Sequence, residues 1–354
     1  MIELSGDYGE GGGQLIRTAC ALAAVSGRDI HLTNIRANRP QPGLKTQHLE
    51  GLKALADLCN GSLEGASLGS REITFRPGKL SKTSLDVHVG TAGSAALVFQ
   101  TLALPASQVG EEVVITLRGG ATFGKWAPPL LATQHVLLPL LARMGFKASI
   151  QVERHGFYPA GGAQVTFAIQ PWTPRPLELG QRGKVTYIGG ISVASSTLRS
   201  GRVAERQARA AEDFLKRRGL QSFVKEQYVE ADCPGSGLVL FAAATSGALL
   251  GGDSLGERGK PAEDVGKDAA IQLMHGLTAL ATADVHVADQ ILPFLALGGG
   301  SFSAPQLSEH AKTTIWVIQQ LLPARFATKQ DGDKVVVTCA GRSHNDARPP
   351  RVSP

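Results

Sequence analysis

One imidazole near the C-terminal end of the chain lies where it could act as a nucleophile. His310 precedes an apolar repeat whose spacing places its members on one face of a helix, namely Ala311, Ile315, Ile318 and Leu322. The residues that could start this helix are Ser303, Pro305, Gln306 and Ser308. Either serine puts His310 in or near the first turn, where free backbone N–H groups and the helix dipole favour a bound anion. By itself, this stretch fits an ordinary surface histidine better.

A glycine-rich run near the N-terminus carries a carboxylate. The run Gly9-Glu10-Gly11-Gly12-Gly13-Gln14 superficially resembles a phosphate-binding loop. It fails the dinucleotide fingerprint because Gln14 stands where the third glycine belongs, and the chain has no Gly-Lys-Ser/Thr of a Walker A loop. A plain turn is equally compatible with this run alone. The carboxylate of Glu10 could ligate a hard cation such as Mg²⁺.

Three arginines follow the glycine run and could bind phosphate. Arg17 lies in an otherwise apolar helix, and Arg36 and Arg39 follow the end of a strand. Guanidinium groups stay charged and bind phosphate oxygens in pairs, so these arginines would suit a phosphate-bearing substrate. The polar residues that could assist them are Lys45, Gln47 and His48. The alternative is three unrelated surface arginines, which explains Arg17 poorly.

The elements that would position these residues recur along the chain. In the first copy we expect a helix, a strand, a helix and a strand pair, at 15–25, 29–34, 47–58 and up to 76. The second copy places the same elements at 95–104, 113–117, 130–144, 148–152 and 165–169. A third copy has a helix at 291–297, the His310 helix and a strand at 334–339. Such recurrence predicts a repeated unit, with three units closing on one core.

In each copy the second helix starts with a similar polar tripeptide that ends in histidine. The three tripeptides are Thr46-Gln47-His48, Thr133-Gln134-His135 and Ser308-Glu309-His310. A stretch with a different order of elements separates the second copy from the third, beginning after a proline-rich boundary at 171–176. We therefore expect a large catalytic domain at 1–179 and 278–342, a smaller inserted α/β domain at 180–277, and a tail at 343–354. Arginines on the charged helix at 201–218 could touch RNA, although a solvated helix face is the default interpretation.

Composition allows a large core and favours a polyanionic partner. The chain has 354 residues, 43% hydrophobic and 19% charged, and a net charge of +6 that weakly indicates nucleic acid or nucleotide binding. Four scattered cysteines without a Cys-x-x-Cys pair favour free thiols over disulfides or zinc, namely Cys20, Cys59, Cys233 and Cys339. No apolar run reaches about 18 residues, so we expect a cytoplasmic protein with no membrane partner.

Taken together, the chain resembles the RNA 3'-terminal phosphate cyclases. The matching runs are Gly9 to Gln14 with Arg17, Ile35-Arg36-Ala37 with Arg39, Pro42-Gly43-Leu44 to Gln47-His48-Leu49, Gly93-Ser94 with Gln100-Thr101, Arg154 to Gly162, Ala288-Asp289-Gln290, and His310. They span nearly the whole chain in the family's order. The resemblance implies an α/β (α+β) fold with a large domain of three repeated units, each of helices and a four-stranded sheet. This domain would be like that of enolpyruvate transferases, with a smaller α/β domain inserted before the third unit.

The resemblance also implies ATP-dependent nucleotidyl transfer of the ligase type, acting in RNA processing. His310 would attack the α-phosphorus of ATP, giving a covalent histidine-AMP and pyrophosphate. AMP would pass to an RNA 3'-phosphate, giving RNA-pp-A, and the neighbouring 2'-OH would close a 2',3'-cyclic phosphate with release of AMP. A neutral imidazole is a good nucleophile near neutral pH because its ordinary pKa is about 6.5.

Residue roles follow from the same resemblance. His310 would be the catalytic residue, and Glu10 would ligate Mg²⁺ or Mn²⁺. Positions that match the family's ATP contacts are Gln100, His286, Val287, Ala288, Asp289 and Gln290, with His286 as a candidate ring for stacking on adenine. Residues that would hold phosphates of ATP or RNA are Gln14, Arg17, Arg36, Arg39, Gln47 and His48. The expected partner is RNA with a 3'-phosphate end, phosphorylated DNA ends being a second class; the oligomeric state is left open.

One loop departs from the family pattern. After Gly119-Gly120 the family usually has Thr and an Asp- or Asn-containing turn, whereas this chain has Ala121-Thr122-Phe123-Gly124-Lys125-Trp126. Polar contacts from this loop are therefore in doubt. Three alternatives share some of these features: a cyclase-like protein of ribosomal RNA processing that has lost catalysis, an enolpyruvyl transferase, and a pure RNA-binding module. The first would lack His310, the second would need six units, and the third does not explain Glu10 and Arg17.

Overall fold

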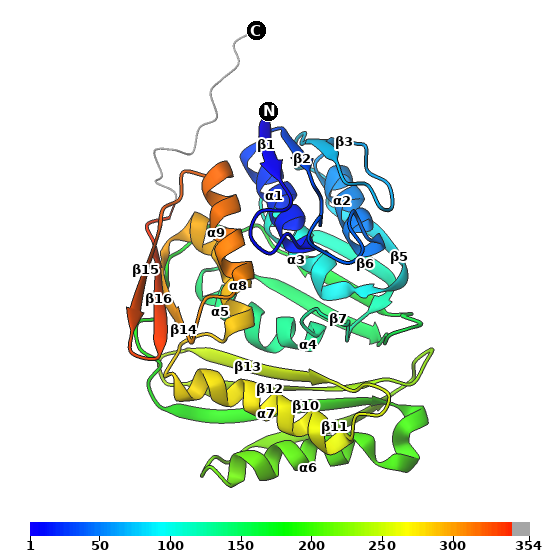
Figure 1. Cartoon of the computed structure of the whole chain (residues 1–354), viewed down its shortest axis with the longest axis vertical. Coiled ribbons are helices and arrows are strands. Elements are labelled where there is room, and N and C mark those ends of the chain that lie inside the picture. The colour runs from blue at the N-terminus through cyan, green and yellow to red at the C-terminus, as the bar shows by residue number, and fades with distance from the viewer. Residues whose placement is uncertain (342–354) are drawn as a thin grey trace.

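The fold is built from one unit that occurs three times (Figure 1). The structure, a computed structural model, describes residues 1–341, so the tail predicted at 343–354 lies outside the described residues. Each unit runs strand, helix, strand, helix and two further strands, and its four strands form one sheet. In every unit the first two strands are parallel, and the spatial order is first, second, fourth, third. This shared order confirms the predicted repeat and fold class.

The first unit carries the glycine-rich run between its first strand and first helix. Its elements are β1 (Ile2–Ser5), α1 (Gly13–Ser26), β2 (Ile30–Thr33), α2 (Thr46–Leu58), β3 (Ser62–Glu64) and β4 (Ile73–Arg76). Helix α1 ends where Gly27 adopts a left-handed φ of 65°, which a glycine takes without strain. The predicted helices at 15–25 and 47–58 are therefore confirmed.

The second unit has longer strands than the sequence suggested. Its elements are β5 (Ser84–Ser94), α3 (Ala95–Ala106), β6 (Val113–Ala121), α4 (Leu130–Ala132), a π-helical turn (Thr133–Leu137), α5 (Leu138–Arg143), β7 (Ala148–Arg154) and β8 (Gln164–Ile169). The run Gly90-Thr91-Ala92-Gly93-Ser94, which leads into α3, is the end of β5. The helix predicted at 130–144 exists, and it contains one π-helical turn.

The third unit is split by the long insertion. Its elements are β9 (Leu177–Glu178), α8 (Val285–Gly298), β14 (Gly300–Ala304), α9 (Glu309–Leu321), β15 (Phe326–Asp331) and β16 (Lys334–Cys339). Because β9 pairs with β14, the insertion follows the first strand of this unit, whereas the sequence pattern predicts it before the whole third copy. Helix α8 also begins six residues earlier than predicted, at Val285, since Asp284 caps it.

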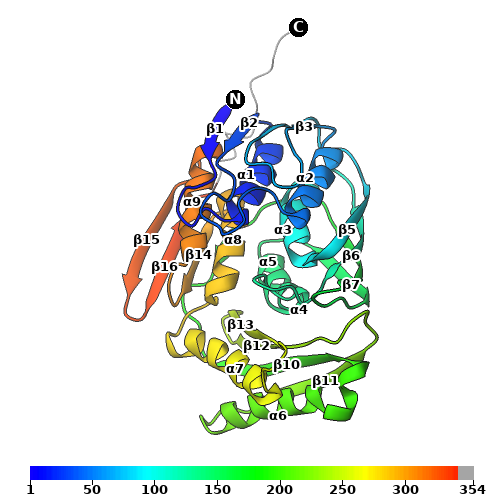
Figure 2. The same cartoon turned by 45° about the vertical axis from the view of Figure 1, so that its right-hand side comes forward.

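The inserted segment has its own sheet and its own core. Its elements are β10 (Val185–Ser195), a 3-10 helix (Ser196–Gly201), α6 (Val203–Lys216), β11 (Phe223–Val229), β12 (Ser236–Ala244), β13 (Leu249–Leu255) and α7 (Ala262–Thr278). Helices α6 and α7 cover one face of the sheet, whose order is β11-β10-β12-β13 (Figure 2). Strand β13 was not predicted. The division into a large domain and an inserted domain at 180–277 stays a prediction.

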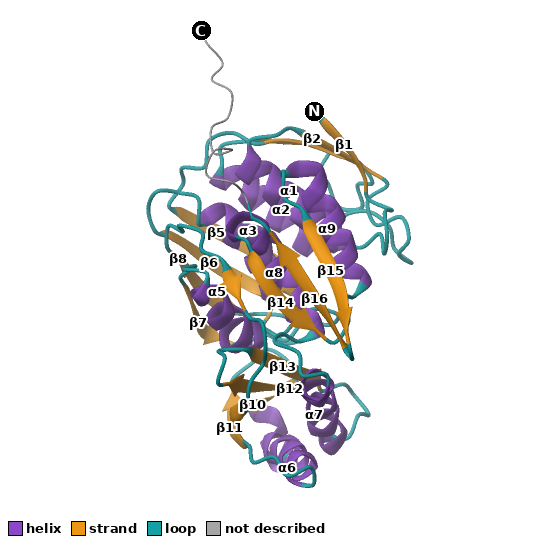
Figure 3. Ribbon diagram, turned by 90° about the vertical axis from the view of Figure 1, so that its left-hand side faces the viewer, coloured by secondary structure: helices purple, strands orange, loops and turns teal. Residues whose placement is uncertain are grey.

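Helices of the three units pack together, with the sheets outside them (Figure 3). Helix α1 packs against α2, α3 and α9, and α8 packs against α9. A single apolar core draws on all three units, and a small separate cluster joins the large part to the insertion through Phe123, Leu131, Phe157, Val193 and Val239. All four cysteines are free thiols, as expected. Within residues 1–341, none of the helices combines the length and the apolar character needed to cross a membrane.

Candidate active site

The predicted nucleophile lies in the first turn of α9. Ser308 is the N-cap of this helix, so Ser303, the other candidate, lies instead in β14. Nδ1 of His310 is 2.7 Å from Oε2 of Glu10, and the other oxygen of Glu10 pairs with Arg39. Partial burial of the imidazole, whose side chain is 40% exposed, and the positive charges of Arg17 and Arg39 lower the pKa of His310 to about 4.

The contact with Glu10 fixes which imidazole nitrogen can react. With a pKa of about 4 the ring of His310 is neutral near pH 7 and carries one N–H. A carboxylate accepts a proton donor, so we assign this N–H to Nδ1, 2.7 Å from Glu10. Nε2 then keeps a free lone pair. The arrangement supplies an uncharged nitrogen nucleophile beside a helix N-terminus that favours phosphate.

A buried carboxyl on α8 is hydrogen-bonded to the N-cap of α9, the helix that carries His310. Asp289 on α8 accepts a hydrogen bond of 2.7 Å from Oγ of Ser308, and the same Oγ accepts the backbone N–H of Ala311 at 2.9 Å. Burial raises the pKa of Asp289 to about 7. The chain Asp289–Ser308–Ala311 therefore holds the first turn of α9, and with it His310, at a fixed distance from α8.

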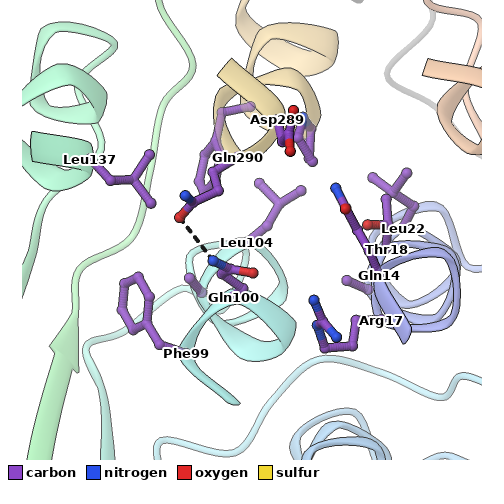
Figure 4. A pocket seen from close by; sticks show the side chains of 14 residues that line it. Gln14, Arg17, Thr18, Leu22, Phe99, Gln100, Leu104, Leu137, Asp289 and Gln290 are labelled. Carbon is purple, nitrogen blue, oxygen red and sulfur yellow. Dashed lines mark hydrogen bonds between the residues drawn. The ribbon is translucent and has the colours of Figure 1, made fainter. Parts of the chain in front are cut away.

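Five of the predicted residues line one hollow between α1, α3 and α8 (Figure 4). They are Gln14, Arg17, Gln100, Asp289 and Gln290. Apolar side chains complete the wall, notably Phe99 and Leu137. Nε2 of Gln100 donates to Oε1 of Gln290 at 2.8 Å, so the two amides lie side by side across the hollow.

Arg17 is the cation of this hollow. Its side chain is only 8% exposed, and no carboxylate among residues 1–341 forms an ion pair with it. Burial lowers its pKa to about 10, so it remains charged at neutral pH. A buried cation without a counter-ion is costly unless an anion binds it. Arg17 is therefore suited to a phosphate group close to His310.

Three other predicted phosphate-binding residues hold the surrounding chain and do not line the hollow. Nη1 of Arg36 donates to the backbone carbonyls of Gln41 and Gly43, both at 2.8 Å. The amide oxygen of Gln47 accepts the backbone N–H of Ser94 at 2.8 Å. His48 is buried against Gly13: a Cβ at that position would lie 2.1 Å from Nε2 of the ring. Arg36 and His48 thus support the segments that carry Arg39 and Glu10, whereas Gln47 holds the end of β5.

The start of α8 lines a second, smaller cleft that the insertion helps to form. His286, Val287 and Gln290 line it together with Pro128 and, from β13, Asp253. His286 is exposed, whereas the side chains of Val287 and Ala288 are buried. Burial raises the pKa of Asp253 to about 6.

Asp284 fixes the start of α8 to the insertion. Its Oδ1 accepts the backbone N–H groups of His286 and Val287 at 2.9 Å each, and its Oδ2 accepts that of Gly251 in β13 at 2.8 Å. Burial raises the pKa of this carboxyl. Asp284 was not predicted, because only the three-dimensional pairing reveals its link to Gly251. Thr314 was also missed: it accepts from Nε2 of Gln14 at 2.7 Å, and its place four residues after His310 was the available signal.

The carboxylate predicted to hold a divalent cation is that of Glu10, whose two oxygens already contact Arg39 and His310. Within the described part of the chain, no three His, Cys, Asp or Glu side chains gather closely enough to hold a metal ion. A Mg²⁺ or Mn²⁺ at Glu10 would therefore take its other oxygens from phosphate groups and water. One carboxylate plus phosphate oxygens is a donor set that suits Mg²⁺ at a nucleotide site, so the residues fit a metal that arrives with its nucleotide.

Fold and site together define a protein of three repeated units that gathers a histidine, a carboxylate and a buried arginine at helix N-termini. The sequence profile of the RNA 3'-terminal phosphate cyclase family matches residues 8–328, and the chain belongs to this family. It is 41% identical to the RNA 3'-terminal phosphate cyclase of Pyrococcus furiosus over 93% of this chain and 95% of the relative. It is also 41% identical to that of Methanopyrus kandleri, over 95% of this chain and 98% of the relative. The predicted family and enzyme class are confirmed.

Among solved structures, the enolpyruvyl transferase NikO of Streptomyces tendae aligns with 96% of this chain. The alignment covers 48% of NikO, with 10% identity and a TM-score of 0.38. A likeness this distant defines no function.

Proposed function

We propose that this chain converts an RNA 3'-terminal phosphate into a 2',3'-cyclic phosphate at the expense of ATP, through a covalent histidine-AMP and an RNA-pp-A intermediate. The observation that supports this most directly is the neutral imidazole of His310, whose Nδ1 lies 2.7 Å from Glu10 at the start of α9. Arg17, which is buried and has no carboxylate partner among residues 1–341, supplies the positive charge that a phosphate requires.

In the first step, Nε2 of His310 bonds to the α-phosphorus of ATP while the bond from that phosphorus to the bridging oxygen breaks. Pyrophosphate leaves with that oxygen. The ring becomes cationic, and the carboxylate of Glu10 beside Nδ1 stabilises this charge. Mg²⁺ or Mn²⁺ held by Glu10 and phosphate oxygens would neutralise charge on the transferring phosphoryl group.

In the second step, an oxygen of the RNA 3'-phosphate attacks the phosphorus of the histidine-AMP. The nitrogen–phosphorus bond breaks, His310 is neutral again, and the RNA end is RNA-pp-A. In the third step, the 2'-oxygen bonds to the 3'-phosphorus, its proton is lost to solvent and AMP leaves. This closure needs only an oriented 2'-OH, and orientation can contribute about 7–11 kcal/mol. The requirement for a 2'-OH selects RNA for cyclisation, whereas a phosphorylated DNA end would stop after adenylylation.

The test is the product formed from an oligoribonucleotide with a 3'-phosphate, ATP and Mg²⁺ or Mn²⁺. We expect an end that resists phosphatase, with one AMP released per end. A matched oligonucleotide with a 2'-deoxy terminal nucleotide should stop at the pp-A stage. The proposal fails if the wild-type protein leaves the 3'-phosphate unchanged with either metal.

A further inference from the structure

One aromatic side chain near the site is far more exposed than folding alone explains. Among the large apolar side chains described, Trp126 has the highest exposed fraction, 90%, and its backbone has a φ of 56°. An indole in water forgoes the free energy of burial, and a left-handed backbone is strained for a residue other than glycine. Both features point to a ligand that covers the ring.

The exposure of Trp126 does not come from a loosely held loop. The backbone N–H of Leu130 donates to the carbonyl of Thr122 at 2.8 Å and closes the base of the loop. The N–H of Thr122 donates in turn to the carbonyl of Gly156 at 2.9 Å. On either side of the tip, Phe123 and Leu131 are buried in the cluster that joins the insertion to the large part. The fold therefore presents Trp126 on an anchored base.

A cation lies over the ring. Nζ of Lys125 is 4.8 Å from the centroid of Trp126, and it is also 3.4 Å from Oε1 of Glu257 in the inserted segment. An exposed aromatic face for a base, next to a cation for the backbone, is the combination that binds single-stranded nucleic acid.

The loop leads directly into the candidate active site. Pro128, two residues after Trp126, lines the small cleft with His286 and Gln290. Gln290 in turn accepts a hydrogen bond from Gln100 of the larger hollow. Trp126 lines neither of these hollows. The exposed ring therefore remains available to a ligand other than one that fills these hollows.

We propose that Trp126 and Lys125 form a subsite for a nucleotide of the RNA upstream of its 3'-phosphate. The base stacks on the indole, and the ammonium group of Lys125 faces the adjoining phosphate. Stacking on an aromatic ring tolerates any base, so this subsite adds affinity for RNA without demanding a sequence. The subsite rests on the proposed function.

The experiment compares Trp126→Ala, Trp126→Phe and a matched control, Phe223→Ala, which removes another exposed aromatic ring (65%) on β11. Loss of one base stack corresponds to a change of about 5- to 150-fold in affinity. We expect Trp126→Ala to raise the KM for 3'-phosphorylated RNA about tenfold, and Trp126→Phe to retain most of the affinity. Phe223→Ala should change nothing, and labelling of the protein by ATP alone should be equal in all variants.

Oligonucleotides with one abasic position identify the stacked base. At one position, an abasic site should lower the affinity of the wild-type protein for the oligonucleotide as much as Trp126→Ala does. Combining the abasic site with Trp126→Ala should cause no further loss of affinity. An unchanged KM for RNA in Trp126→Ala overturns the subsite, and so does a raised KM for ATP, which would place the ring against adenine. Quenching of tryptophan fluorescence by the oligonucleotide without ATP measures binding independently of catalysis. Quenching that survives Trp126→Phe also overturns the subsite, whereas failure of the wild-type protein to become labelled by ATP contradicts the proposed function instead.

Discussion

At the scale of the residue, the proposed chemistry depends on a histidine kept neutral beside positive charges. We propose that Arg17 and Arg39 bind the anionic substrate; partial burial, together with these same charges, lowers the pKa of His310 to about 4. Glu10 contacts both groups: one carboxylate oxygen pairs with Arg39, and the other accepts the N–H at Nδ1 of His310. Sequence reasoning selected all four residues. It could not predict their contacts, since Glu10 and His310 are 300 positions apart.

The pH profile of adenylylation tests the state of this imidazole. A histidine with its ordinary pKa of 6.5 would lose reactivity as the pH falls through that value, whereas one with a pKa of about 4 stays neutral to lower pH. We therefore expect the rate at which ATP labels the protein to stay constant from pH 8 to about pH 5.5 and to fall only below that. The measurement uses saturating ATP. A rate that halves near pH 6.5 would contradict the lowered pKa.

At the scale of the element, the first helices of the three units, α1, α3 and α8, line one hollow because each holds the same place in its unit. The repeat could be predicted, because the helices of each unit carry apolar periodicity and turn signals. Strand β9, two residues long, has no such periodicity, and its pairing with β14 spans the whole insertion, so the sequence did not indicate it. The start of α8 was missed because Asp284 precedes the expected helix and takes its second partner, Gly251, from the insertion.

Ser308 is the residue that joins α8 to α9. Replacement by alanine removes an N-cap and leaves Asp289 without its donor, so Ser308→Ala should destabilise the protein by about 0.5–2 kcal/mol. Because the first turn of α9 carries His310, labelling by ATP should also slow at saturating ATP. Ser308→Thr keeps the hydroxyl and should restore both properties. Urea unfolding and labelling rates measure them, and a Ser308→Ala protein with unchanged values would show that this link is unimportant.

At the scale of the whole molecule, buried titratable groups make stability depend on pH in opposite directions. Burial lowers the pKa of His155 from 6.5 to about 4, so the unfolded chain takes up a proton at a higher pH than the folded protein does. The stability associated with the neutral ring is therefore present above pH 6.5 and is lost as the pH falls towards 4. Asp289 behaves oppositely. Its carboxyl has a pKa raised from 3.8 to about 7, so the folded state keeps a proton that the unfolded chain releases, and stability falls as the pH rises between these values.

The substitution Asp289→Asn isolates the effect of the Asp289 carboxyl on the pH dependence of stability. The amide oxygen can still accept from Ser308, but the side chain never ionises, so the variant escapes the cost of a buried charge. A rise of the Asp289 pKa from 3.8 to about 7 lowers the free energy of unfolding at high pH by about 4 kcal/mol, at 1.36 kcal/mol per pKa unit. We expect the variant and the wild type to be equally stable near pH 4, and the variant to be more stable by about 2–4 kcal/mol at pH 8. Parallel urea unfolding curves give the difference, and a difference independent of pH would contradict the raised pKa.

The central claim is that His310 carries AMP during the reaction, and its most direct test is covalent labelling with α-³²P-ATP and Mg²⁺ or Mn²⁺. We expect a labelled protein whose bond is labile in acid and stable in alkali, as a phosphoramidate is. The label should be absent from His310→Asn and retained in His275→Asn, a matched change at an exposed histidine of α7. Absence of label from the wild-type protein with both metals, or its persistence in His310→Asn, would contradict the claim.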